Sequence, residues 1–209
     1  AHERSVDGEA RISLVRNRIR DVVLEQTPPD LRQQIHCRLG EAFELRYQRN
    51  SEAIVESLAR HFEAGGLPAK AMPYMVQAAR KLITRTFVSE GLELLDRALA
   101  IEPEARRFFT LDDADRRRAE LQLERARALS HLGDWPAARE AVRGADELAR
   151  DLNDLRLQTR TATELAGQAR RHLKFEEALE HLRRALQLAE VLGDRRLQIE
   201  PLYEYGAVQ

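Results

Sequence analysis

The chain has 209 residues, 43% of them hydrophobic and 33% charged, so it can form a packed interior and is not wholly disordered. The formal net charge of −1 excludes strong long-range attraction to nucleic acid or to an anionic membrane. No apolar run long enough to span a bilayer is present, and the single cysteine, Cys37, cannot form an internal disulfide. These features fit a reducing, cytoplasmic location without nucleic-acid or membrane partners.

The elements expected along the chain are all helical. Apolar periodicity and capping signals predict about ten helices, near residues 12–25, 29–47, 51–64, 68–84, 88–101, 112–132, 135–151, 154–172, 175–191 and 195–207. Pro103 is expected to stop the helix that reaches Ile101, whereas Thr110 and the pairs Gly133-Asp134 and Gly193-Asp194 mark helix boundaries. No segment alternates polar and apolar residues convincingly, so we expect an all-α fold with no strand of four or more residues.

Two segments repeat without a gap at an offset of 40 residues: residues 148–158 read LARDLNDLRLQ and residues 188–198 read LAEVLGDRRLQ. A small, a bulky and a small residue also recur at spacings of four and three, which place all three on one helix face. The copies are Ala71-Met75-Ala78, Gly91-Leu95-Ala98, Ala138-Val142-Ala145 and Ala178-Leu182-Ala185. We interpret these faces as close helix–helix contacts within repeats, the alternative being the amphipathic helices of an ordinary bundle.

This pattern resembles the tetratricopeptide repeat. The matching positions are Leu58-Ala59, Phe62, Gly66, Ala71, Met75 and Ala78; then Ala126, Leu129, Gly133, Trp135, Ala138, Val142 and Ala145; then Leu165-Ala166, Ala169, Phe175, Ala178, Leu182 and Ala185. The resemblance implies an antiparallel helix-pair solenoid. The period of 40 departs from the usual period of about 34 residues, so the helices or turns are expected to be longer.

The N-terminal part resembles the helical junction that follows the ATPase in large bacterial signal-transduction ATPases, some fused to kinase or cyclase modules. The matching residues are Ile19-Arg20-Asp21-Val22-Val23-Leu24-Glu25, Pro28-Pro29, Ile35-His36, Arg38-Leu39 and Glu41-Ala42-Phe43-Glu44. Residues 1–50 are therefore expected to form a junction that fits the tail of a preceding domain. Residues 51–209 are expected to form tetratricopeptide-like repeats, the last of them truncated. The ATPase motif G-x4-G-K-[ST] is absent from the chain.

No constellation typical of catalysis or metal binding is evident. The six histidines do not pair with one another or with Cys37 at metal-ligand spacing on a shared face. Neither a nucleophile-elbow motif nor a phosphate-binding loop is present. We predict no catalytic residue, cofactor site or metal site in this chain.

The tetratricopeptide resemblance implies that the first helix of each pair lines a groove that receives a peptide or a helix. Carried over by motif, the candidate groove residues are Glu56, Arg60, Glu63, Arg127, Ser130, His131, Thr163, Arg170 and Arg171. The later ones are mainly basic, so an acidic protein segment is the expected ligand, the alternative being an unused, solvated surface. The predicted function is a protein-interaction module that serves as the sensor or regulatory arm of a signalling protein. The alternative is an intramolecular regulatory or oligomerisation domain of a signalling ATPase or transcription regulator, with no separate peptide ligand.

The last predicted helix has a second apolar side. Leu197, Leu202 and Tyr205 are expected to pack on the helix at 175–191, which leaves Ile199, Tyr203 and Val208 without a sequential neighbour to cover them. We therefore expect self-association through residues 195–209 at high concentration.

Overall fold

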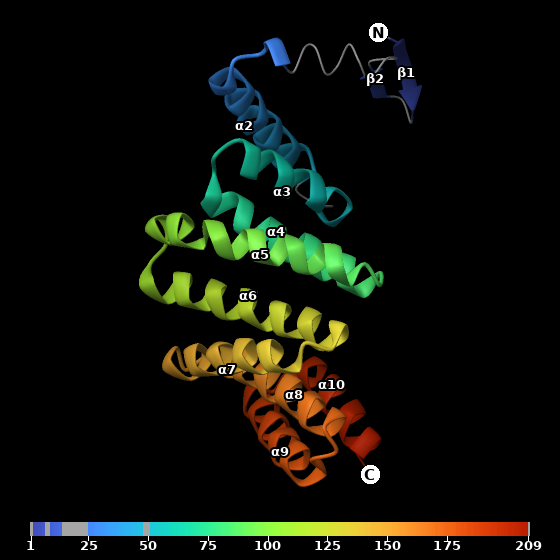
Figure 1. Ribbon diagram of the computed structural model, residues 1–209, viewed down its shortest axis with the longest axis vertical. Helices are drawn as coiled ribbons and strands as arrows, with labels where there is room; N and C mark the ends of the chain where they lie inside the picture. Colours follow the sequence, from blue (N-terminus) through green and yellow to red (C-terminus); the bar gives the residue numbers. More distant parts are fainter. Residues whose placement is uncertain (1, 7–8, 14–24, 48–50, 209) are drawn as a thin grey trace.

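The computed structural model describes residues 2–6, 9–13, 25–47 and 51–208, and its folded body consists of helices (Figure 1). These are α2 (Pro29–Arg46), α3 (Val55–Ala64), α4 (Pro68–Thr84), α5 (Val88–Ala105), α6 (Leu111–Leu132), α7 (Trp135–Asp151), α8 (Leu155–Arg171), α9 (Phe175–Leu192) and α10 (Arg195–Val208), with short 3-10 turns η1 (Ser51–Ile54) and η2 (Arg106–Phe108). The helices predicted from residue 29 onward are thus confirmed, most of them to within three residues. Most of the helix predicted at 12–25 lies outside the described residues.

The prediction that the chain has no strand of four or more residues was wrong. β1 (His2–Val6) and β2 (Glu9–Ser13) form an antiparallel two-stranded sheet in which His2 pairs with Ser13 and Val6 with Glu9. The sequence between the strands is Asp7-Gly8, a dipeptide typical of two-residue hairpin connections. The prediction of an all-helical chain depended on the lack of convincing apolar alternation and did not take this hairpin signal into account.

The prediction that Pro103 stops α5 was also wrong, because the helix continues to Ala105. Proline in a helix removes one hydrogen bond and clashes with the preceding turn, but here it lies only two residues from the helix end. Packing holds that last turn in place. Ala105 is fully buried, and the buried carboxylate of Glu102 forms ion pairs with Arg106 at 3.6 Å and Arg118 at 3.3 Å.

Side-chain caps fix where the later helices begin. Thr110 Oγ1 accepts a hydrogen bond from the Asp113 amide, Asp134 Oδ1 from the Ala137 amide and Asp154 Oδ1 from the Leu157 amide. Two helices end at glycines with left-handed backbones, Gly133 with φ 82° and Gly193 with φ 64°. Glycine adopts this conformation without steric cost, so the boundaries predicted at these positions are confirmed.

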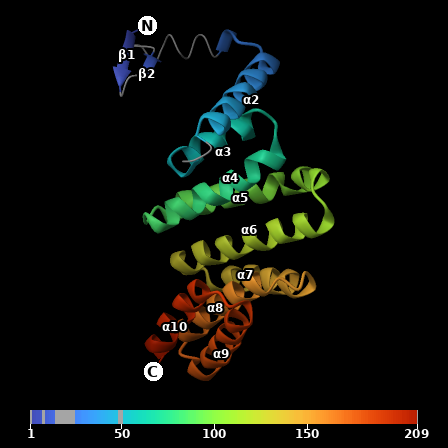
Figure 2. The ribbon, with the colours of Figure 1, turned by 180° about the vertical axis from the view of Figure 1, so that it is seen from behind.

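From α2 to α10, each helix packs against the next one along the chain, so the molecule is a stack of neighbouring helix pairs (Figures 1 and 2). Alternate helices also touch, because α4 contacts α6, α6 contacts α8, and α8 contacts α10. These four helices therefore form a continuous row, which we call the even row. Figure 2 shows α10 beside α8 at the end of this row.

Small side chains allow the helices to approach closely. The alanines of the small–bulky–small pattern and their bulky partners are fully buried: Ala71, Met75, Ala78, Leu95, Ala98, Ala138, Val142, Ala145, Ala178, Leu182 and Ala185. One cluster of buried residues joins α3, α4, α5 and α6, and a second joins α6, α7 and α8. The predicted contact faces are thus confirmed as the core of the stack.

The 40-residue offset recurs in the contacts between helices of the even row. Arg116 Nε on α6 lies 3.0 Å from Asp154 Oδ2 at the start of α8. Forty residues later, Arg156 Nη2 on α8 lies 2.7 Å from Asp194 Oδ2 at the start of α10. The repeat is therefore a repeat of tertiary contacts and not only of helix-forming residues.

Helix α2, which falls within the predicted N-terminal junction, packs directly on the helices that follow it. Glu44 accepts hydrogen bonds from Lys70 Nζ and from the Tyr74 hydroxyl, both at 2.8 Å. Burial and the bond to Glu44 together raise the pKa of Tyr74 to about 12. At Gly40 the helix passes directly over the fully buried ring of Phe62.

We expect opposite effects from alanine at two helical glycines. A Cβ at Gly40 would lie 2.8 Å from Phe62 Cε1, so Gly40→Ala should lower the free energy of unfolding by about 1–2 kcal/mol. A Cβ at Gly144 in α7 would meet nothing within 4 Å, so Gly144→Ala should raise it by about 0.5–1 kcal/mol through helix propensity. Denaturant unfolding of both variants measures whether the free energy of unfolding falls in one and rises in the other. A stabilising Gly40→Ala would contradict the close packing of α2 on α3.

His36 and His61, which are distant in the sequence, are in contact where α2 packs on α3. His36 Nδ1 lies 2.9 Å from His61 Nδ1, and the Phe43 ring packs edge-on against the largely buried His61 ring. At this distance one nitrogen must donate and the other accept, so both rings cannot be protonated there. Burial, followed by the charges of His36 and Arg60, lowers the pKa of His61.

Acid should therefore weaken this contact. Because the pKa of His61 is lower in the folded chain than its ordinary 6.5, its contribution to stability is present above pH 6.5 and is lost as the pH falls through the folded value. We expect the free energy of unfolding to decline over this interval and to decline less steeply in His61→Gln. Denaturant midpoints measured across mildly acidic pH test this. Equal slopes in both proteins would show that protonation of His61 is not coupled to folding.

The exposed side of α10 differs in part from expectation. Ile199 and Tyr203 are exposed, as predicted, whereas Val208 is half-buried, and Leu202 is exposed rather than packed on α9. Forty residues earlier, the corresponding positions of α8 are Thr159, Ala162 and Thr163, and all three are buried. The exposed face of α10 thus corresponds to a face that is buried in α8.

Self-association through residues 195–209 stays a prediction. We expect this chain to sediment as a concentration-dependent oligomer, because three apolar side chains of α10 are exposed side by side. Tyr203→Glu should shift the chain to monomer, whereas a glutamate at the exposed Arg143 on α7 should not. Wild-type chain that sediments as a monomer at all concentrations would count against this contact.

Candidate functional site

A groove with a volume of about 510 Å³ runs along the even row. It is lined from α4 by Arg80, Ile83 and Thr84, with Thr86 just beyond; from α6 by Glu124, Arg127, Ser130 and His131; from α8 by Thr163, Glu164, Gly167 and Arg171; and from α10 by Glu200 and Glu204. Because the row is continuous, one surface collects charged side chains from four helices that are far apart in the sequence.

The structure places five of the nine predicted groove residues in this groove: Arg127, Ser130, His131, Thr163 and Arg171. Arg170 lies beside it and binds Glu204 of the lining, with Nε 2.8 Å from Oε2.

The other three predicted residues lie on α3, outside the groove lining. Glu56 forms an ion pair with Lys81, Glu63 forms one with Arg97, and Arg60 is exposed. The motif assigned α3 as the groove-lining helix of the first pair, whereas α4 occupies that position in the even row.

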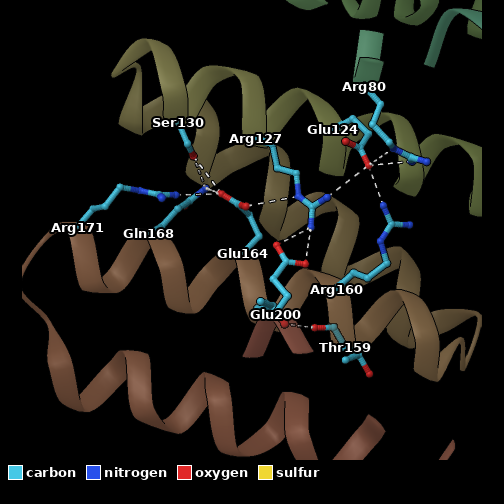
Figure 3. Close-up of polar contacts among 11 residues, drawn as sticks. Arg80, Glu124, Arg127, Ser130, Thr159, Arg160, Glu164, Gln168, Arg171 and Glu200 are labelled. Carbon is cyan, nitrogen blue, oxygen red and sulfur yellow. Dashed lines mark hydrogen bonds and ion pairs between the residues drawn. The ribbon is translucent and has the colours of Figure 1, made fainter. Parts of the chain in front are cut away.

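Glu124 is the buried centre of one half of the groove. Its Oε1 accepts hydrogen bonds from Arg80 on α4, at 3.1 and 2.9 Å, and from Arg160 on α8 at 2.7 Å (Figure 3). Burial lowers the pKa of Arg160, as do the nearby charges of Arg127 and Arg80, whereas Glu124 raises it. The carboxylate thus connects three successive helices of the row.

Glu164 is the buried centre of the other half. Its Oε1 accepts hydrogen bonds from Ser130 at 3.1 Å, Arg171 at 3.3 Å and Gln168 at 3.5 Å (Figure 3). Burial raises the pKa of Glu164, although Arg127, Arg171 and the hydrogen bonds act in the opposite direction. The effect of desolvation on the pKa of Glu164 is therefore larger than the effect of its contacts.

Arg127 lies between the two halves and faces three carboxylates. Its Nη1 is 3.7 Å from Glu124 Oε1, its Nε is 3.6 Å from Glu164 Oε2, and its Nη2 is 3.3 Å from both oxygens of Glu200. Burial lowers the pKa of Arg127, but the three glutamates together raise it above its ordinary value. The guanidinium is therefore held charged inside the groove.

The groove glutamates follow the repeat. Glu124, Glu164 and Glu204 lie 40 residues apart on α6, α8 and α10, and each binds an arginine. None of the four groove glutamates, Glu124, Glu164, Glu200 and Glu204, was predicted from the sequence, although three of them recur at the 40-residue offset that aligned the repeats. The basic character predicted for the groove is balanced by these glutamates. What the site offers is a set of paired donors and acceptors suited to binding a polar chain.

Two further cavities lie outside the even row. One, of about 380 Å³, is lined by α7, α8 and α9 around the buried Asp146, which binds Arg150 and Arg184. The other, of about 630 Å³, lies between α5, α6 and α7 and is lined in part by Glu102 and Gly144. Neither collects residues from four helices, so the groove is the better candidate site.

No family model matches this chain, and no curated protein matches it. Within the described ranges, no helix is long and apolar enough to cross a membrane. The same residues contain no group of three or more His, Cys, Asp or Glu side chains that could hold a metal ion.

Proposed function

We propose that the chain is a protein-interaction module whose groove receives an extended segment or a helix. The observation that carries this proposal is the convergence of four helices of the even row on one groove lined by charged and hydroxyl side chains. Helix-pair solenoids present such a surface along their length to a partner segment. In this function the chain binds and has no catalytic role of its own.

The architecture that we propose is a tetratricopeptide-like solenoid. The pairing of sequential helices, the contacts between alternate helices and the recurrence of the Arg–Asp contact after 40 residues support it. The fully buried Ala138 and Ala178 at equivalent positions of α7 and α9 support it as well. Each repeat covers the apolar face of its neighbour, which is how such arrays gain stability.

The partner is a segment of another protein or another domain of the same polypeptide. The resemblance of the N-terminal part to signal-transduction ATPases favours a regulatory arm of a cytoplasmic signalling protein. The second candidate function is an oligomerisation or intramolecular regulatory domain without a separate peptide ligand. The exposed Ile199, Leu202 and Tyr203 on α10 are the observation that favours this second function.

A matched pair of glycine substitutions tests the groove. Gly167 on α8 lines it, and a Cβ there would meet only the Arg171 guanidinium, at 3.6 Å or more, so Gly167→Trp fills the groove without entering the core. Gly144→Trp adds the same side chain to the cavity between α5, α6 and α7. Peptides are selected from a random displayed library on the wild-type chain, and their binding to both variants is measured by fluorescence anisotropy.

We expect Gly167→Trp to abolish binding of the selected peptides and Gly144→Trp to leave it unchanged. Circular dichroism melts of both variants check that each is folded. Selected peptides that bind Gly167→Trp as well as wild type would overturn the proposal that the groove is the binding site.

A further inference from the structure

Glu200 differs from the other groove carboxylates in its exposure. The side chains of Glu124, Glu164 and Glu204 are 3%, 9% and 17% exposed, whereas that of Glu200 is 59% exposed. In the described part of the chain, the hydrogen bonds of Glu200 are the two at 3.3 Å from Arg127 Nη2. A contact this long and this exposed stabilises the chain little, so Glu200 can leave it at small cost.

Arg127, by contrast, has more N–H donors than hydrogen bonds in the described part of the chain. A guanidinium carries five N–H groups, and those on Nη2 make the only hydrogen bonds of Arg127 within the described residues. Its Nε and Nη1 approach Glu164 and Glu124 only at ion-pair distances of 3.6 and 3.7 Å. The strongest partner for such a group is a carboxylate that accepts two parallel hydrogen bonds.

We propose that Glu200 is an internal stand-in for the ligand: a carboxylate side chain of the partner segment displaces it and binds Arg127 in its place. This inference rests on the proposed function and names the chemistry of the partner, an acidic protein segment. Glu200 occupies Arg127 in the free chain and so lowers the apparent affinity for any acidic segment. The groove therefore discriminates against weakly acidic partners, which cannot compete with the internal carboxylate.

The surroundings of Arg127 fit an anionic side chain of the ligand. Arg80 is 45% exposed on its α4 side of the groove, and the exposed His131 ring lies along the rim. Glu124 and Glu164 are held by their own arginines and by Ser130, so they do not follow Glu200 out of the groove. Once Glu200 has left, the three arginines of the lining face three glutamates instead of four, so the excess of negative charge in the groove is removed.

The test uses a gain of binding, which a misfolded variant cannot imitate. The probe is a short capped oligoglutamate peptide with a fluorescent label, and its oligoglutamine counterpart is the uncharged control. Glu200→Gln removes the competing charge with little change in shape. Asp96→Asn is the matched control, because it removes an equal charge from a similarly exposed ion pair, that of Asp96 on α5 with Arg125, and neither residue lines the groove.

We expect Glu200→Gln to bind oligoglutamate roughly tenfold more tightly than wild type, the gain that follows if Glu200 occupies Arg127 about nine-tenths of the time. Asp96→Asn should bind like wild type, and oligoglutamine should bind none of the proteins. Equal affinities of wild type and Glu200→Gln would overturn the inference, as would a gain of the same size in Asp96→Asn. An oligothymidylate that competes as well as oligoglutamate would also overturn it, because the site would then bind any polyanion.

The Gly167→Trp variant separates this inference from the proposed function. If filling the groove abolishes oligoglutamate binding while Glu200→Gln changes nothing, the groove stands as the binding site and the displacement of Glu200 is wrong. If Gly167→Trp binds oligoglutamate as wild type does, the groove is not the site, and both the function and the inference fail.

Discussion

Replacing Glu124 by glutamine should lower the free energy of unfolding by about 2–3 kcal/mol. The substitution keeps the shape of the side chain but removes the buried charge that faces Arg80, Arg127 and Arg160. Removing one partner of a fully buried ion pair costs about 3–5 kcal/mol, because the remaining charge is left without compensation. We expect less here because solvent reaches Arg80 and screens its charge.

The matched control is Glu63→Gln on α3. Glu63 also binds an arginine of another helix, but its partner, Arg97, is 57% exposed. Exposed ion pairs contribute about 0–1 kcal/mol, so this change should be small. Urea unfolding of the two variants gives the comparison. Equal losses would show that the even row is not held together by its buried carboxylates.

Leucine in place of Ala138 or Ala178 should cost roughly 1–3 kcal/mol in each case. Both alanines are fully buried where α7 and α9 pack on their neighbours, so a larger side chain forces the helices apart. The melting temperatures of the two variants should fall together, because the positions are equivalent in the repeat.

Ala137→Leu is the control for this pair, since Ala137 lies next to Ala138 on α7 but is only half-buried. It should change stability by no more than about 0.5 kcal/mol. Unchanged stability in both Ala138→Leu and Ala178→Leu would contradict the alignment of the repeats.

Much of the helical fold could be predicted from local signals. Helix ends at Gly133 and Gly193 depend on backbone conformations that glycine adopts readily, and the starts at Thr110 and Asp134 depend on caps within the same turn. Such signals act over a few residues and are visible in the sequence. Pro103 was misjudged because the buried contacts of Glu102, which hold its turn, come from another helix.

The groove was harder to predict because it depends on which helices share a row. The small–bulky–small face of α4 fits the second helix of a pair with α3, but α4 also packs on α5 and α6. Sequence periodicity does not choose between these roles, so Glu56, Arg60 and Glu63 were placed in the groove and Arg80 was not. The contact of Arg127 with Glu200 joins residues 73 apart in the sequence, a separation that no local pattern reports.

The most direct test of the proposed function is a crystal structure of the chain with a peptide selected from the displayed library. We expect the peptide to lie along the even row between α4 and α10, with a carboxylate on Arg127 and with Glu200 turned away. A peptide bound instead on the opposite side, against α5, α7 or α9, would contradict the assignment of the groove as the binding site.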